Sequence, residues 1–430
     1  MADKQMKLRR ALGLPMLTFY GTGMILGAGI YSIIGQAAGI AGESLWYGFL
    51  LAGIAALLTA LSYAELSTMY PTAGAEYVFL KKAFQKHRWF AATIGIVVVF
   101  AGCASAATVA LAFSSYLAHF MALPRVAVAC SVLIFFTVIN LFGIRQSSWT
   151  NAVFTIVEIF GLVVFIWLGW RHPDFGNALS AVPTFSTFTS AALIIFAFLG
   201  FENIVSLAEE TVEPEKNIPR AIFLSLFIST LLYVLVSFSA VALMPPEQLA
   251  LTESALLDAS LNSSSGLARM MGGIALFSTA NTVLIALVTT SRVIYGISKD
   301  HSLPSALSKT LTKQKTPWIA ALVAMSTAMV LLLFGKVETL ASISSFATMI
   351  VFISVNAALI RLRKTEPQTK RPFRVPWAIR TYPVLPWLGI VICIAFLFQF
   401  NQTIYLTGLF AFACSAGLYF LSRHFWVEAK

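Results

Sequence analysis

The sequence predicts an all-α integral membrane protein with twelve transmembrane helices, from its composition, its apolar runs and its charge distribution. Of the 430 residues, 58% are hydrophobic and only 11% are charged, which is typical of a membrane protein. A spanning helix needs about 20 apolar residues. The twelve runs that approach or exceed this length are residues 15–38, 45–67, 90–118, 126–143, 151–170, 188–207, 221–244, 267–292, 318–334, 339–360, 384–400 and 404–422.

The basic residues indicate how the chain crosses the membrane. With twelve spans both termini lie on one side, and 25 of the 29 Lys and Arg residues fall on that side. Basic loops are typical of the cytoplasmic side, so we expect a multi-pass protein of the plasma or inner membrane with both termini in the cytoplasm. Topology and contacts with lipid headgroups account for the net charge of +11. We therefore expect no nucleic-acid partner.

The predicted spans divide the chain into five parts. These are a cytoplasmic N-terminal segment (1–14), spans 1 to 5 (15–170), spans 6 to 10 (188–360), the last two spans (384–422) and a cytoplasmic tail (423–430). An odd number of spans in each group of five gives the two groups opposite orientations. The sequence therefore predicts an inverted repeat of five plus five helices, followed by two more.

The first and sixth spans carry residues that interrupt a helix. The first has five glycines between positions 21 and 35, with Gly27-Ala28-Gly29 near the middle of the span, and each Gly costs roughly 1 kcal/mol relative to Ala in a helix. The sixth contains Gly200 and then Glu202. Interrupted spans at corresponding positions of two halves predict a transporter site near the midplane. The alternative for the glycines is close packing of helices through small residues.

Five motifs occur in order along the chain. They are ILGAGIY at 25–31, YAEL and PTAGAEY within 63–77, FAFLGFE at 196–202 followed by NIPRAI at 217–222, the pairs SR, KD and LP between 291 and 304, and RPFRVP at 371–376. Together they resemble the amino acid–polyamine–organocation (APC) superfamily, and in particular its amino acid permeases. Ala28 and Tyr31 are mild departures from the family's first motif.

The resemblance implies a LeuT-like fold in which helices 1 and 6 are broken and cradle the substrate. It also implies that Phe196 occupies the place of a gating aromatic residue. We therefore expect a secondary transporter, a permease that moves an amino acid by alternating access as a symporter or antiporter, with proton coupling as a hypothesis. The alternatives are a polyamine or amine exchanger of the same fold and a transporter-like nutrient sensor.

Backbone groups at the two breaks are expected to recognise the substrate. The amides that begin the outer half of helix 1 suit a carboxylate, and the carbonyls that end the preceding half-helices suit an ammonium group. Glu202 can brace the broken helices or contact the substrate. The predicted substrate-binding residues are Ile25, Gly27, Ala28, Gly29, Ile30, Phe196, Ala197, Leu199, Gly200 and Glu202.

Glu158 is an ionisable residue about 10 Å inside the fifth span, counted at about 1.5 Å per residue. An ionisable group at that depth is a functional-site hypothesis. The resemblance implies that many family members have Lys at this position, whereas this chain has Glu158. A mechanism that depends on that lysine therefore does not transfer to this chain. Glu158 is a candidate proton site, sodium ligand or partner of a basic residue, and the alternative is a neutral structural carboxyl group. The predicted coupling residues are Glu158 with Ser278, Asn281 and Thr282 of the eighth span.

The hydroxyl groups of the eighth span have a simpler interpretation as well, because Ser and Thr often bond their own helix backbone. Arg292, at the end of that run, is expected to extend to the membrane surface. The HExxH, GxSxG and GxxxxGK[ST] motifs do not occur, so zinc peptidases, serine hydrolases and ATP-driven pumps are not supported. We expect a non-enzyme with no cofactor and no metal. Its expected partners are a small-molecule substrate, a proton or sodium ion, and membrane lipids.

Overall fold

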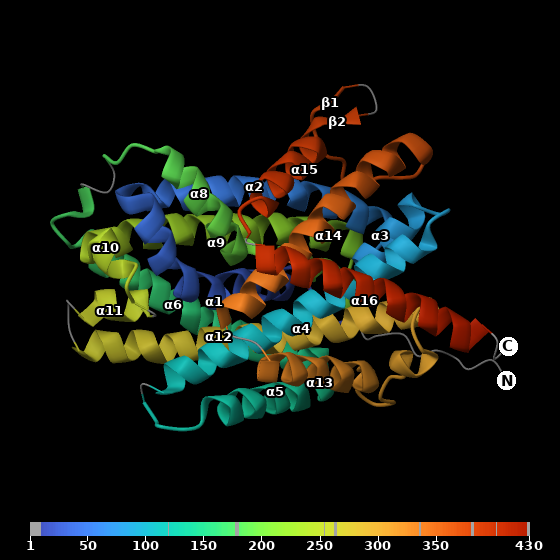
Figure 1. Ribbon diagram of the computed structural model, residues 1–430, viewed down its shortest axis with the longest axis horizontal. Helices are drawn as coiled ribbons and strands as arrows, with labels where there is room; N and C mark the ends of the chain where they lie inside the picture. Colours follow the sequence, from blue (N-terminus) through green and yellow to red (C-terminus); the bar gives the residue numbers. More distant parts are fainter. Residues whose placement is uncertain are drawn as a thin grey trace.

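The computed structural model describes residues 10–427, except 119, 177–179, 253, 262–264, 335–336, 380–381 and 401. Figure 1 shows one elongated bundle of helices in which α1 lies between α9 and α12. The first half of the chain forms α1 (Leu14–Ala41), η1 (Gly42–Ser44), α2 (Leu45–Met69), α3 (Ala75–Ala83), α4 (Arg88–Ala118), α5 (Arg125–Leu141) and α6 (Ile144–Trp170).

The second half begins with α8 (Phe185–Ile194), η2 (Ile195–Phe198) and η3 (Phe201–Glu210), which together replace one continuous helix. It continues with α9 (Pro214–Leu243), α10 (Pro246–Leu249), α11 (Ala255–Leu261), α12 (Ser265–Lys299), η4 (Ser305–Ser308), α13 (Trp318–Phe334) and α14 (Val337–Thr365). The chain ends with the short antiparallel pair β1 (Ala378–Ile379) and β2 (Tyr382–Pro383), then α15 (Val384–Leu397) and α16 (Gln402–Val427).

Eight helical stretches within the described residues are long and apolar enough to cross a membrane. Three shorter apolar helices, α5, α13 and α15, add to these. Many large side chains on the outer face of the bundle are apolar and exposed, for example Phe160 at 59% and Phe227 at 67%. Such a surface suits lipid rather than water. The prediction of an all-helical membrane protein is therefore confirmed.

Helical geometry is interrupted at both sites that the sequence singled out. In α1 the break is at Gly27, with φ −26° and ψ −140°. In the sixth span the chain leaves η2 through the extended Leu199 and enters η3 through Gly200, whose φ of 134° favours glycine. The break in α1 lies against η2 and η3, so two segments far apart in sequence meet near the middle of the bundle.

The segment before α1 is attached to the end of η3. The backbone amides of Ala11 and Leu12 donate to the carbonyl of Glu210 at 2.9 and 3.0 Å, and Val212 N donates to Leu12 O at 2.8 Å. These bonds close one end of the bundle around α1. The other end of α1 is surrounded by α8, α10 and α11.

Candidate functional site

A cavity lies between the two breaks. Its lining includes seven of the ten predicted substrate-binding residues, namely Ile25, Gly29, Phe196, Ala197, Leu199, Gly200 and Glu202. Its volume is about 70 Å³, and about 10–15 Å³ is enough to hold one water molecule. The space therefore suits a small polar molecule. Gly27 and Ile30 are not among the described residues that line it, and the side chain of Ala28 lies outside the described part of the chain.

Two further helices complete the wall. Val98, Gly102, Ser105 and Val109 follow one face of α4 at spacings of three and four residues, and Ser344, Thr348 and Val351 do the same on α14. Thr282 of α12 also lines the cavity. The faces of α4 and α14 were not predicted from the sequence. The sequence signal that could have identified these faces is the recurrence of small and hydroxyl-bearing residues at helical spacing.

Three glycines allow the broken segments to approach closely. A Cβ atom at Gly27 would lie 1.8 Å from Thr282 Oγ1, and one at Gly29 would lie 2.6 Å from Ala197 Cα. At Gly200 a Cβ atom would lie 2.6 Å from Met24 Cγ. Real Cβ atoms do not approach other heavy atoms so closely. These glycines therefore serve the packing of the two breaks on each other and on α12, in addition to the breaks themselves.

The carbonyl groups at the breaks have hydrogen-bond partners. The hydroxyl of Tyr233, buried on α9, contacts the carbonyl oxygens of both Ile25 and Ala197, the latter at 3.1 Å. The amide of Leu199 donates to Phe196 O at 3.1 Å. Each carbonyl oxygen has two lone pairs, so one hydrogen bond does not by itself prevent such a group from accepting another. Tyr233 was not anticipated from the sequence, because it lies in an unbroken apolar run.

Glu202 folds back onto the second break. Its Oε2 accepts a hydrogen bond from the amide of Gly200 at 2.8 Å, and its Oε1 accepts one from Asn203 Nδ2 at 3.3 Å. The carboxyl group thus satisfies an amide that the break leaves outside helical bonding. It also lines the cavity, so bracing and contact with a ligand are compatible roles.

Glu76, the second residue of α3, is a cavity residue that the sequence analysis did not select. Its side chain is buried, it lines the cavity, and its Oε2 has no hydrogen-bond partner in the described part of the chain. Burial, together with the nearby charge of Glu202, raises the pKa of Glu76 to about 8, against an opposing effect of the α3 backbone. A buried carboxyl group of this kind in a cavity is a functional candidate.

Glu158 lies on the face of α6 that packs against α12. Its side chain is fully buried, Oε1 accepts a hydrogen bond from Ser278, and Oε2 has no partner among the residues described. No Lys or Arg of the described ranges forms an ion pair with it.

The other predicted coupling residues lie in the same region. Asn281 bridges α12 to α6: its Oδ1 accepts from Asn151 Nδ2 at 2.9 Å, and its Nδ2 donates to Thr155 Oγ1 at 3.1 Å. Thr282 donates to the carbonyl of Ser278 at 3.1 Å, a bond within its own helix. Ser278 and Asn281 therefore meet α6, whereas Thr282 faces Gly27 and the cavity.

Arg292 is not at the membrane surface, and that expectation is wrong. Its side chain is fully buried, with Nε 3.1 Å from Glu210 Oε2 and Nη2 3.2 Å from Glu210 Oε1. Nη1 donates to Asn140 Oδ1 at 2.6 Å and to Ser291 Oγ at 3.0 Å. Arg292 thus ties α12 to η3 and α5 at the end of the bundle where α1 begins.

Comparisons with known proteins agree with this architecture. The family model for amino acid permeases matches residues 12–417. The chain is 30% identical to the branched-chain amino acid permease BcaP of Bacillus subtilis over 90% of its length and 87% of that protein. It is 28% identical to the methylthioribose transporter of the same organism, covering 97% and 94%. It is 26% identical to the mitochondrial cationic amino acid transporter 3 of Arabidopsis thaliana, covering 85% and 64%.

The match spans nearly the whole chain, and these relatives are named as transporters rather than enzymes. The chain belongs to the amino acid permease family of the APC superfamily and is a multi-pass membrane transporter.

Proposed function

We propose that the protein is a secondary transporter that moves an amino acid across the plasma or inner membrane by alternating access. The observation that carries the proposal is the cavity between the two breaks, which is walled by both interrupted segments. In this proposal both termini are cytoplasmic. The first repeat comprises α1, α2, α4, α5 and α6, the second comprises α8 with η2 and η3, α9, α12, α13 and α14, and α15 and α16 complete twelve spans.

Phe196 supports the gating part of the proposal. It lines the cavity between the breaks and also a second cavity, which has a volume of about 400 Å³. The second cavity lies along the outer half of α1, at Ile33 and Gln36, and along α14 at Met349. In this proposal Phe196, which lines both cavities, separates the larger outer one from the smaller inner one. Its movement would open or close the path of a substrate.

Uptake by the purified protein in liposomes tests the proposal. A transporter accumulates or exchanges a labelled amino acid, whereas a nutrient sensor binds it without moving it. A thermal-shift screen against all amino acids and common amines selects the substrate first, because a ligand of the native state raises the melting temperature. Binding without any uptake or exchange would contradict a transport function.

A second candidate substrate class is an amine with an additional positive charge, such as a cationic amino acid or a diamine. The observation that favours it is the pair of carboxyl groups, Glu76 and Glu202, in one cavity whose described lining includes no Lys or Arg. Two acids without a basic partner suit a cationic ligand. A neutral amino acid offers a single ammonium group to the two, so the other carboxyl group would stay protonated.

The pH dependence of binding distinguishes the two classes. Because the pKa of Glu76 is raised to about 8, its carboxyl group is mostly protonated at pH 7 when the cavity is empty. A cation that binds the ionised carboxylate must therefore displace this proton. Binding of lysine or putrescine should therefore strengthen by up to about ten-fold per pH unit between about pH 6 and 8. The Glu76→Gln variant should lose this slope. Isothermal titration with leucine as the neutral reference checks it; tight binding of leucine alone would remove the second candidate.

For coupling, we propose that Glu158 loads a proton from one side of the membrane and releases it on the other. Its Oε2, without a described partner, is the free position. Uptake by the wild type should then depend on pH between about pH 5 and 8 without a need for sodium, and Glu158→Gln should flatten the profile. Glu247→Gln, an exposed position on α10, is the matched control. Identical profiles for wild type and Glu158→Gln would assign a structural role, and a sodium requirement lost in the variant would assign a sodium site.

A further inference from the structure

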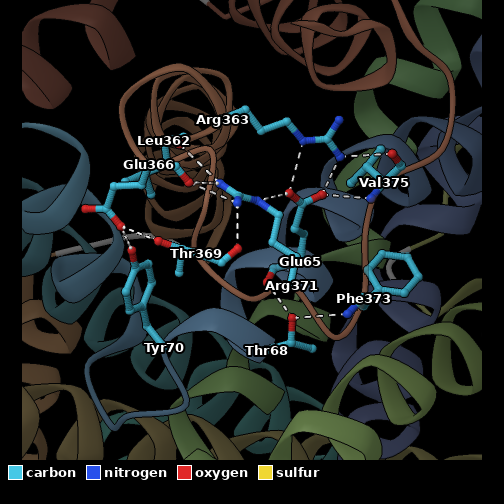
Figure 2. A network of polar contacts seen from close by, with 10 residues as sticks. All are labelled: Glu65, Thr68, Tyr70, Leu362, Arg363, Glu366, Thr369, Arg371, Phe373 and Val375. Atoms are coloured by element: carbon cyan, nitrogen blue, oxygen red, sulfur yellow. Dashed lines mark hydrogen bonds and ion pairs between the residues drawn. The ribbon is translucent and has the colours of Figure 1, made fainter. Parts of the chain in front are cut away.

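The loop that follows α14 folds back over the end of α2 and is held there by Glu65 (Figure 2). Glu65 is fully buried and accepts four hydrogen bonds. Arg363 donates from Nε at 3.0 Å and from Nη2 at 2.5 Å, Arg371 donates from Nε at 3.1 Å, and the amide of Val375 donates at 2.7 Å. One carboxylate thus faces two guanidinium groups, so the cluster retains positive charge.

Arg371 has no capacity left for another ligand. Its Nη1 donates to the carbonyls of Glu366 and Thr369 at 3.0 and 2.9 Å, and its Nη2 donates to those of Leu362 and Glu366 at 3.1 and 3.0 Å. With Nε bound to Glu65, every nitrogen of the group is engaged. Arg371 therefore shapes the loop.

Arg363 differs from Arg371 in one atom. Nε and Nη2 are engaged by Glu65, and Nη2 also donates to Val375 O at 2.9 Å, but Nη1 has no hydrogen-bond partner within the described chain. The side chain is only 2% exposed, and in Figure 2 the free nitrogen points away from Glu65. Buried donors of charged groups are almost always satisfied. The described residues supply no acceptor here, so the acceptor must come from outside them.

A cavity adjoins this arginine. Its volume is about 300 Å³. It is lined by Arg363, Pro367, Thr369, Arg371 and Arg374. Arg374 is exposed and forms no hydrogen bond or ion pair with other described residues. Glu366, the nearest acid of the loop, does not line the cavity, and its carboxylate accepts from Tyr70 at 2.6 Å and Thr369 at 3.2 Å. Even with Glu65 and Glu366 counted, the three arginines leave a positive charge.

We propose that this arginine cavity is a binding site for a phosphate group, with Arg363 in its wall and Arg374 at its mouth. A guanidinium group presents paired N–H donors that match the oxygens of a phosphate. The cavity has room for a phosphate ester rather than for the ion alone. Such a ligand neutralises the cluster, and it reaches the buried Nη1 of Arg363 once the side chains around that atom shift.

Two sources supply this chemistry, a lipid headgroup and a soluble phosphate. The neighbouring β1–β2 hairpin carries Trp377 and Tyr382, which are 76% and 49% exposed, and α15 follows with Trp387 at 51%. Exposed aromatic residues of this kind are enriched where a protein meets the membrane interface. The site would therefore be within reach of headgroups at the end of the bundle where α2 and α14 terminate.

The test uses the purified full-length protein in a neutral detergent. Melting temperatures are measured against inorganic phosphate, glycerol phosphate and short-chain phosphatidylglycerol, with sodium chloride at equal ionic strength and phosphatidylcholine as references. The Arg374→Gln variant removes the guanidinium group at the mouth of the cavity and leaves the Glu65 cluster intact. Lys364→Gln, an exposed position on the same helix end, makes the same change of charge outside the cavity.

We expect the phosphate compounds to raise the melting temperature of wild type and Lys364→Gln in a saturable way. In Arg374→Gln the apparent affinity should fall by about ten-fold or more, the loss of one charge-assisted hydrogen bond. Stabilisation by phosphatidylglycerol alone assigns the lipid headgroup, and stabilisation by the soluble compounds as well assigns a general phosphate site. No saturable stabilisation, or an equal response of Arg374→Gln and wild type, would overturn the proposal and leave water as the partner of Arg363.

Discussion

Replacing Gly29 with valine is expected to abolish transport while leaving the protein folded and inserted. A Cβ atom at this position would lie 2.6 Å from Ala197 Cα, 3.1 Å from Ala197 Cβ and 3.3 Å from Ala197 O. Two of these three atoms belong to the backbone of η2, so no side-chain rotation relieves the clash. The broken segments must separate, which distorts the cavity that both of them line. Uptake per molecule of inserted protein should fall by more than about 100-fold, since misplacement by about 1 Å can already cost this much.

A matched control is available in α12. A Cβ atom at Gly273 has open space around it, with no heavy atom within 4 Å, so Gly273→Val makes the same chemical change without a clash. Both variants should reach the membrane and elute from gel filtration as the wild type does. Near-normal uptake by a well-expressed Gly29→Val protein would show that the approach of α1 to η2 is not needed for transport.

The breaks could be predicted because their signal is local. Helix stability is lowered by glycines within an apolar run, and by a Gly followed by an acidic residue in a second run. This effect is intrinsic to the local sequence and does not depend on the tertiary structure. The structure interrupts the helices at Gly27 and at Leu199-Gly200 accordingly. Ser278 and Asn281 were also accessible, because their spacing places them on one helical face, and that face contacts α6.

Residues whose importance depends on distant partners could not be found in this way. Tyr233 lies within an apolar helix, and only the fold shows that its hydroxyl reaches the carbonyls of both breaks. Glu76 follows a turn, in a segment that contains several polar residues. Only the packing of α3 in the fold buries its side chain in the wall of the cavity. Arg292 stands at the end of an apolar run, where a long basic side chain usually reaches water. Its carboxylate partner is 82 residues away in the sequence.

The Glu210–Arg292 pair is the second place where a single substitution should have a large effect. Both side chains are buried, with exposures of 2% and 0%. Breaking a buried pair by removing one partner leaves the other charge uncompensated and costs about 3–5 kcal/mol. Glu210→Gln removes the charge with little change of shape and keeps the backbone bonds from Glu210 O to the start of α1. We therefore expect a marked drop in the melting temperature of the detergent-solubilised protein.

The exposed pair Glu213–Lys216 provides the control, because its side chains are 62% and 65% exposed. Glu213→Gln makes the same substitution three residues away and should cost no more than about 1 kcal/mol, as surface ion pairs do. The double variant Glu210→Gln/Arg292→Gln removes both charges. It should lose less stability than the sum of the two single variants, since neither buried charge is left alone. Equal effects of Glu210→Gln and Glu213→Gln, or strict additivity in the double variant, would show that the buried pair does not hold η3 to α12.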